Sequence, residues 1–140
     1  MPAYIESLTT NWFTVSDTSE LQALVGRIEC EPREGSGETL TVHQRDGQVR
    51  LTMFDCLDTR LDYYDDDLDD DVDFVEALVK LLAEGAVLRV TSVSWYKSEV
   101  ARFMYTVYTA DGRSYDMNTM AAESAAAKEF GIPASVLQAF

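Results

Sequence analysis

Positive charge is scarce in this chain of 140 residues. It has 11 lysines and arginines against 25 aspartates and glutamates, and its formal net charge is -14. A field of this sign repels nucleic-acid phosphates and anionic membrane surfaces. The composition therefore argues against a protein that binds nucleic acid or a membrane directly, and it favours a partner with a basic surface.

Long apolar runs are also absent. No run reaches the roughly 18 residues that a membrane helix needs. Residues 1–10 carry no lysine or arginine and include Glu6, unlike a secretory signal. We therefore expect a cytoplasmic protein. A length of 140 residues and an apolar fraction of 46% predict a single folded domain over residues 1–140.

Residues that often carry chemistry are few. Cys30 and Cys56 lack CxxC spacing, which favours two free thiols, although a single disulfide stays open. His43 is the only histidine, so a zinc site would need His43, both cysteines and a carboxylate to converge. The sequence has no glycine-rich phosphate loop. We expect no metal, no cofactor and no catalytic residue, and hence a protein that is not an enzyme.

Local patterns predict an α+β fold. Asp17 with Glu20 three residues later resembles a capping box at a helix start. Asp46-Gly47 between two alternating segments is typical of a two-residue hairpin turn. Gly85 stands where a helix from residue 66 would end.

The predicted order is β-α-β-β-α-β-β-β-α, with a mainly antiparallel sheet and helices packed on one face. The predicted elements are strands at 11–15, 40–45, 48–53, 87–96, 100–109 and 114–117, and helices from residue 17 to about 28, at 66–84 and at 119–130.

The negative charge is concentrated in one segment. Residues 55–76 hold 11 of the 25 carboxylates and only one basic residue, Arg60. Acidic residues stabilise a helix N-terminus and aid solubility. These effects explain two or three carboxylates, whereas a further crowd of like charges costs stability.

A calcium loop is one alternative. Counted from Asp65, oxygen ligands occur at alternate places, and Glu76 is twelfth, which resembles EF-hand spacing. The pattern departs at the sixth place, where Asp70 stands instead of glycine, and the apolar stripe that begins at Leu68 favours a continuous helix. The candidate calcium ligands are Asp65, Asp67, Asp69, Asp71, Asp73 and Glu76.

Mimicry of nucleic acid is the other alternative. A rigid helix with outward carboxylates offers closely spaced negative charges to a groove built for phosphates. Binding would be electrostatically steered and sensitive to salt. The candidate partner-binding residues are Asp62, Asp65, Asp66, Asp67, Asp69, Asp70, Asp71 and Asp73, with Tyr63 and Tyr64 adding apolar contact at the rim.

Three segments carry a resemblance to known proteins: Thr10-Asn11-Trp12-Phe13, the acidic residues 69–74, and residues 81–85 leading into a long strand pair. With them, the chain resembles small acidic proteins of phages, plasmids and other mobile elements. This resemblance implies a counter-defence role of the anti-CRISPR or anti-restriction type. The favoured hypothesis is a non-enzymatic DNA mimic that blocks a basic nucleic-acid-binding groove. An acidic accessory or immunity-type protein that uses its sheet face is a further alternative.

Overall fold

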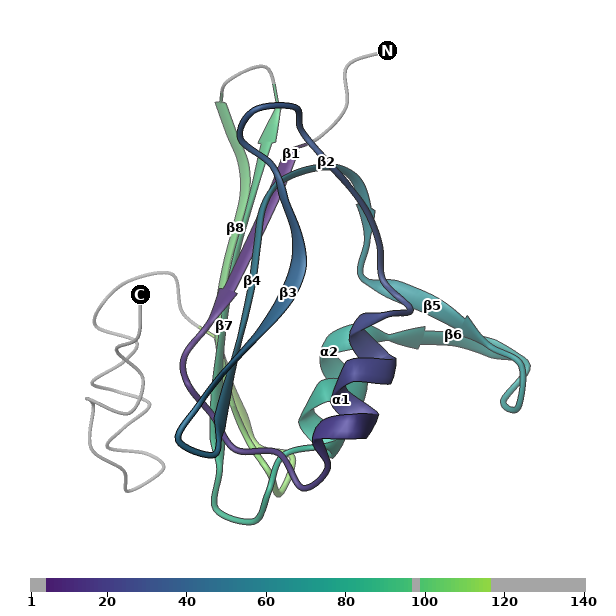
Figure 1. Ribbon diagram of the computed structural model, residues 1–140, viewed down its shortest axis with the longest axis vertical. Helices are drawn as coiled ribbons and strands as arrows, with labels where there is room; N and C mark the ends of the chain where they lie inside the picture. Colours follow the sequence, from purple (N-terminus) through teal and green to yellow (C-terminus); the bar gives the residue numbers. More distant parts are fainter. Residues whose placement is uncertain (1–4, 97–98, 117–140) are drawn as a thin grey trace.

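The computed structural model describes residues 5–96 and 99–116. Its centre is a curled, seven-stranded antiparallel sheet with the order β2-β4-β1-β7-β8-β9, and β3 also pairs with β4 (Figure 1). The strands are β1 (Ile5–Thr10), β2 (Glu29–Pro32), β3 (Glu38–Arg45), β4 (Gln48–Arg60), β7 (Val87–Tyr96), β8 (Glu99–Thr109) and β9 (Ser114–Asp116).

The predicted hairpin around Asp46-Gly47 is confirmed. Both turn residues have positive φ, 50° and 78°, as this turn requires. β4 then continues beyond β3, and β2 pairs with its second half along the same edge. Pro32 is opposite Cys56, and Glu38 is opposite Phe54. Residues 29–32 and 38, which lie outside the predicted strands, are therefore strand as well.

The long strand pair near the end of the described region is also confirmed. β7 and β8 pair from Val87↔Thr109 to Tyr96↔Glu99. β9 follows a turn in which Gly112 has a φ of 91°. The predicted helix at 119–130 lies outside the described residues.

The predicted strand at 11–15 is wrong, because β1 ends at Thr10. The Asn11 side chain donates to the Val87 carbonyl at 3.0 Å and accepts from the Arg89 amide at 2.8 Å. The Asn11 side chain thus makes the hydrogen bonds to the β7 backbone that the backbone of a regular neighbouring strand would make. In the rest of the segment 11–15, Phe13 and Val15 form isolated β-bridges, with Val49 and Leu82 respectively.

The first helix begins as predicted. α1 spans Thr18–Val25, and Asp17 caps it by accepting from the amides of Ser19 and Glu20 at 2.8 and 3.2 Å. Leu21 and Leu24 are buried on the face that meets the sheet. The helix ends earlier than expected, so Ile28 is buried outside it.

The predicted helix at 66–84 is wrong over its acidic half. Residues 62–73 form a hairpin of β5 (Asp62–Asp65) and β6 (Asp70–Asp73), and α2 covers only Phe74–Lys80. Aspartate is a weak helix former that favours caps and turns, and like charges three or four apart repel each other in a helix. Within the predicted span only residues 74–80 are helical, so the helix also ends before the predicted stop at Gly85.

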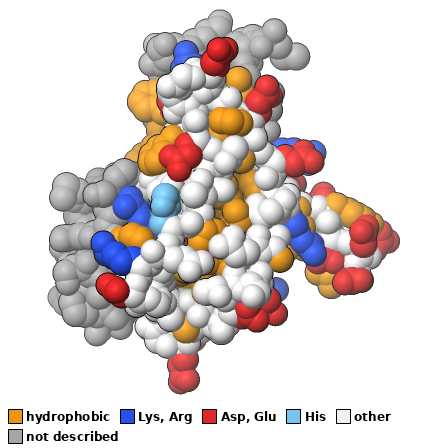
Figure 2. All heavy atoms as spheres, viewed as in Figure 1, with side chains coloured by type: hydrophobic (Ala, Val, Ile, Leu, Met, Phe, Trp, Pro, Cys, Tyr) orange, Lys and Arg blue, Asp and Glu red, His pale blue; other side chains and the backbone are white. Residues whose placement is uncertain are grey.

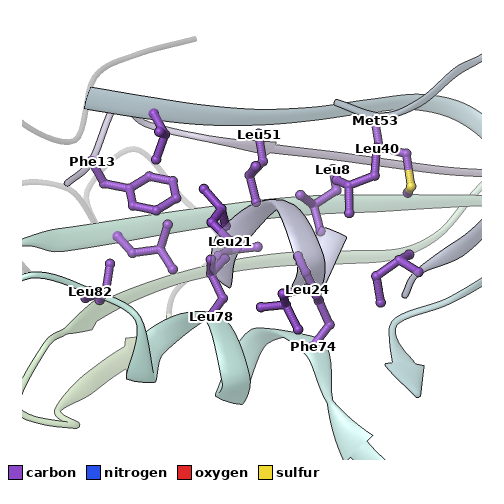
Figure 3. Close-up of a cluster of buried hydrophobic side chains, with 14 of the residues drawn as sticks. Leu8, Phe13, Leu21, Leu24, Leu40, Leu51, Met53, Phe74, Leu78 and Leu82 are labelled. Carbon is purple, nitrogen blue, oxygen red and sulfur yellow. The ribbon is translucent and has the colours of Figure 1, made fainter. Parts of the chain in front are cut away.

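The core lies between the sheet and the two described helices (Figure 3). α1 and α2 lie side by side next to the sheet (Figure 1). Leu21, Leu24, Phe74 and Leu78 from the helices join sheet residues in one buried cluster with Leu8, Leu40, Val49, Leu51, Met53, Leu88 and Val90.

The described residues establish an α+β fold with a mainly antiparallel sheet. The predicted element order is wrong, because it omitted β2 and the β5–β6 pair. Packing of all helices on one face is not confirmed, since the last predicted helix lies outside the described region. Within that region, no helix is long and apolar enough to cross a membrane.

Candidate functional site

The acidic residues are carried by the β5–β6 hairpin, which extends away from the main sheet (Figure 1). The two strands form their own small sheet, with Asp62 opposite Asp73, Tyr63 opposite Val72, Tyr64 opposite Asp71, and Asp65 opposite Asp70. Residues 66–69 form the turn. We call residues 62–73 the acidic hairpin.

The turn of the acidic hairpin is built by aspartate side chains. Asp65 Oδ1 accepts from the amides of Asp67 and Leu68 at 2.9 and 3.2 Å. Asp69 has a φ of 51°, a left-handed conformation that aspartate tolerates better than most residues. The Tyr64 hydroxyl donates to Asp69. These local bonds favour a turn over a helix in this sequence.

The base of the hairpin is fixed to the core. Asp73 caps α2 by accepting from the Glu76 amide at 3.0 Å. The Phe74 amide donates to the Leu61 carbonyl at 2.8 Å, and the Phe74 side chain is fully buried. The end of β6 is thereby tied to the first turn of the helix that packs against the sheet.

Two arginines hold the first strand of the hairpin. The Arg27 guanidinium lies 4.9 Å from the centroid of the Tyr63 ring and 3.6 Å from Asp65. Arg60 lies 3.6 Å from Asp62. Tyr63 packs against the core cluster. Asp62 and Asp65, the two carboxylates of this strand, are thus partly neutralised by the chain itself.

The other six aspartates are exposed: Asp66, Asp67, Asp69, Asp70, Asp71 and Asp73. Within the described residues, none of them forms an ion pair. Figure 2 shows acidic side chains gathered on the protruding hairpin. Two cross-strand pairs, Asp62↔Asp73 and Asp65↔Asp70, place like residues directly opposite, which destabilises a hairpin when both are ionised.

The apolar contacts differ from the prediction. Tyr64 is exposed, as a rim residue should be, but Tyr63 is half-buried beneath Arg27. The hydrogen bond to Asp69, with smaller effects of desolvation and Asp71, raises the pKa of Tyr64. Leu68 at the tip is 67% exposed. Sequence reasoning assigned Leu68 to a buried helix stripe and therefore missed it.

An open cleft of about 570 Å³ lies between the hairpin and the body. Arg27, Glu29 and Arg60 line it from the body, and Tyr64, Asp66 and other hairpin residues line it from the opposite side. Arg27 and Glu29 were not candidates from the sequence, because nothing in their local pattern links them to residues 62–73.

The structure does not have the EF-hand arrangement. Residues before Asp65 belong to strands β4 and β5, not to an entering helix, and Asp71 and Asp73 lie in a strand. In the described part of the chain, no three His, Cys, Asp or Glu side chains converge in a way that could hold a metal ion. Calcium binding by these carboxylates stays a prediction for titration.

The histidine lies elsewhere, on the β3–β4 hairpin. His43 Nε2 is 2.7 Å from the Thr52 hydroxyl on the neighbouring strand.

Comparisons of the chain with protein-family models, with curated proteins and with solved structures gave no match. The functional argument therefore depends on the geometry of the acidic hairpin.

Proposed function

We propose that this protein is a non-enzymatic binding protein that presents the acidic hairpin to a basic, nucleic-acid-binding groove of another protein. The observation that carries this proposal is the exposure of six aspartates, without ion pairs among the described residues, on a hairpin that projects from the body. Crowded like charges lower stability, so the fold by itself gives no reason to place them together.

The charge density of the hairpin supports mimicry of nucleic acid. Strands of four residues are about 13 Å long at about 3.3 Å per residue. Duplex DNA carries one charge per about 1.7 Å of axis, so about 13 Å of duplex carries about eight charges. The acidic hairpin holds eight aspartates. Six of these aspartates are exposed and without an ion pair within the described residues, so a groove lined with lysine and arginine would meet a comparable density of negative charge.

The anchoring of the hairpin supports the same function. Preorganised binding groups lose less conformational entropy on association than flexible ones. Arg27 and Arg60 hold the first strand of the hairpin and the buried Phe74 holds its base, while six aspartates in the turn and the second strand stay exposed. The basic residues near the hairpin thus leave these six charges open to a partner.

The test neutralises four of the six exposed carboxylates without changing side-chain shape. The variant carries Asp66→Asn, Asp67→Asn, Asp70→Asn and Asp71→Asn, which keeps the turn carboxylate Asp65 and the cap Asp73. Immobilised wild-type protein should capture nucleic-acid-binding proteins from host lysate at low salt. Added duplex DNA or high salt should then elute these proteins. The variant should capture at least tenfold less.

A matched control loses four negative charges elsewhere, through Glu31→Gln, Glu34→Gln, Glu84→Gln and Asp46→Asn, all at exposed positions. This control should bind like the wild type. Equal loss of binding in both variants would mean that net charge, not the hairpin, is recognised. Captured proteins that added DNA does not displace would contradict the mimicry.

The implied biological role is counter-defence. The resemblance to acidic proteins of mobile elements suggests that the blocked groove belongs to a CRISPR effector or a restriction enzyme. Purified effectors of these classes, assayed for DNA binding with and without the protein, provide the direct test.

A second candidate function uses the sheet instead of the hairpin. Trp95 and Phe103 on the β7–β8 pair are 37% and 42% exposed, which favours an apolar contact surface of an accessory or immunity-type protein. If the hairpin variant and the control both keep the partner, this surface is the better candidate.

A further inference from the structure

The two cysteines, which stand far apart in the sequence, meet at the junction of three strands. β2 and β3 follow one another along the same edge of β4, with a turn at residues 33–37 between them. Cys30 stands two residues before Pro32, whose cross-strand partner is Cys56. The cysteines are therefore diagonal neighbours on adjacent strands.

Both sulfur atoms contact the start of β3. The Leu40 amide donates to Cys30 Sγ at 3.5 Å, and Cys56 Sγ donates to the Glu38 carbonyl at 3.2 Å. Cys56 is fully buried in the core cluster, and Cys30 packs against that cluster while remaining partly exposed. The two thiols thus face the same interior, and one of them is open to solvent.

We propose that Cys30 and Cys56 form a reversible intramolecular disulfide when the protein meets a small disulfide oxidant such as glutathione disulfide. The bond would fasten the edge strand β2 to β4. This inference is independent of the proposed function of the hairpin.

Closing the bond requires a small movement of β2. Diagonal neighbours in an antiparallel pair have Cα atoms about 7–8 Å apart, and a disulfide needs about 4.4–6.8 Å. The register of β2 shifts between Glu29 and Glu31, at Cys30 itself. β2 is a four-residue edge strand, so a movement of about 1 Å disturbs few hydrogen bonds.

The reaction has two exchange steps. The Cys30 thiolate attacks one sulfur of glutathione disulfide, which forms a mixed disulfide and releases one glutathione. The Cys56 thiolate then attacks Cys30 Sγ and releases the second glutathione. The two cysteines lose two electrons and two protons, and glutathione disulfide gains them as two thiols.

The second step should be slow at neutral pH. Burial, the adjacent Cys30 thiol, and the carboxylates of Asp55 and Glu38 raise the pKa of Cys56 to about 11. Because the thiolate is the attacking form, its population grows about tenfold per pH unit below that value. Burial and the two carboxylates still act after Cys30 is bonded to glutathione, so closure should be at least tenfold faster at about pH 9 than at about pH 7.

The experiment follows the native wild-type chain with glutathione disulfide at about pH 9, where closure is fast, by intact mass and peptide mapping. The expected course is a transient glutathione adduct at Cys30, followed by a species lighter than the reduced chain by two hydrogen atoms, with the peptides of Cys30 and Cys56 linked. A persistent adduct, disulfide-linked dimers, or two thiols that stay open to alkylation would overturn the proposal.

Two variants separate the steps. Cys56→Ala should stop at the glutathione adduct on Cys30, and Cys30→Ala should not react while folded, because Cys56 is buried. Rapid reaction of Cys56 in the Cys30→Ala variant would contradict the proposed order. If an alanine variant does not fold, the linked peptides of the wild-type chain still decide whether the bond forms.

Discussion

Aspartate has several different roles within the acidic hairpin. The Asp65 carboxylate accepts two amide hydrogen bonds in the turn and lies near Arg27. Asp73 caps α2, whereas the Asp71 side chain is exposed and forms no ion pair within the described residues. Substitutions of different aspartates should therefore change stability by different amounts.

At this scale we predict that Asp73→Ala lowers the free energy of unfolding by about 1 kcal/mol, because the Glu76 amide loses its acceptor. Relief of the repulsion from Asp62 offsets a few tenths of this loss. Asp71→Ala should change stability by less than about 0.5 kcal/mol. Urea unfolding of both variants provides the comparison, and equal destabilisation would show that Asp73 does not act as a cap.

At the scale of elements, the acidic hairpin has little stability of its own. A two-stranded hairpin is marginal in water unless it packs against something else. Here Leu61 and Tyr63 pack against the core cluster, Arg27 stacks on Tyr63, and Val72 is half-buried opposite Tyr63. α1 and the residues after it therefore determine how firmly the hairpin is held.

We predict that Arg27→Ala weakens the hairpin by about 1 kcal/mol, from the lost cation–π contact and ion pair. Amide hydrogen exchange at residues 63–72 should become severalfold faster, while exchange in β7 and β8 stays unchanged. Arg33→Ala removes the same charge from an exposed turn and serves as the control. Similar exchange in both variants would exclude Arg27 as the anchor.

At the scale of the whole molecule, the concentration of charge matters more than its total. The net charge is -14, and residues 55–76 contribute 11 carboxylates against Arg60 alone. Like charges that are exposed and close together repel at low ionic strength and are screened when salt is added. The same aspartates that repel one another and lower stability attract a basic partner.

We therefore predict that sodium chloride stabilises the wild-type protein. Raising its concentration from about 0.01 M to about 0.5 M should increase Tm by a few degrees, because the Debye length falls from about 30 Å to below 8 Å. The variant with four hairpin asparagines should start at a higher Tm and gain less from salt. A wild-type Tm that does not rise with salt would contradict this account.

The sequence by itself determined the features that depend on neighbouring residues. Asp17 predicted the start of α1, Asp46-Gly47 predicted the β3–β4 turn, and the β-branched segments predicted β7 and β8. The location of the negative charge was also evident from the sequence. Each of these signals acts over a few residues, where backbone preference and side-chain capping dominate.

Only the tertiary structure decided how the acidic residues are presented. The spacing of Leu68, Val72 and Val75 suits a helix, but Val72 pairs with Tyr63 in a hairpin that Arg27, two residues after the end of α1, holds in place. Cys30 likewise meets Cys56 only because β2 and β3 share an edge of β4. Such contacts join segments far apart in the chain, and strand pairing and burial select them, so local patterns could not reveal them.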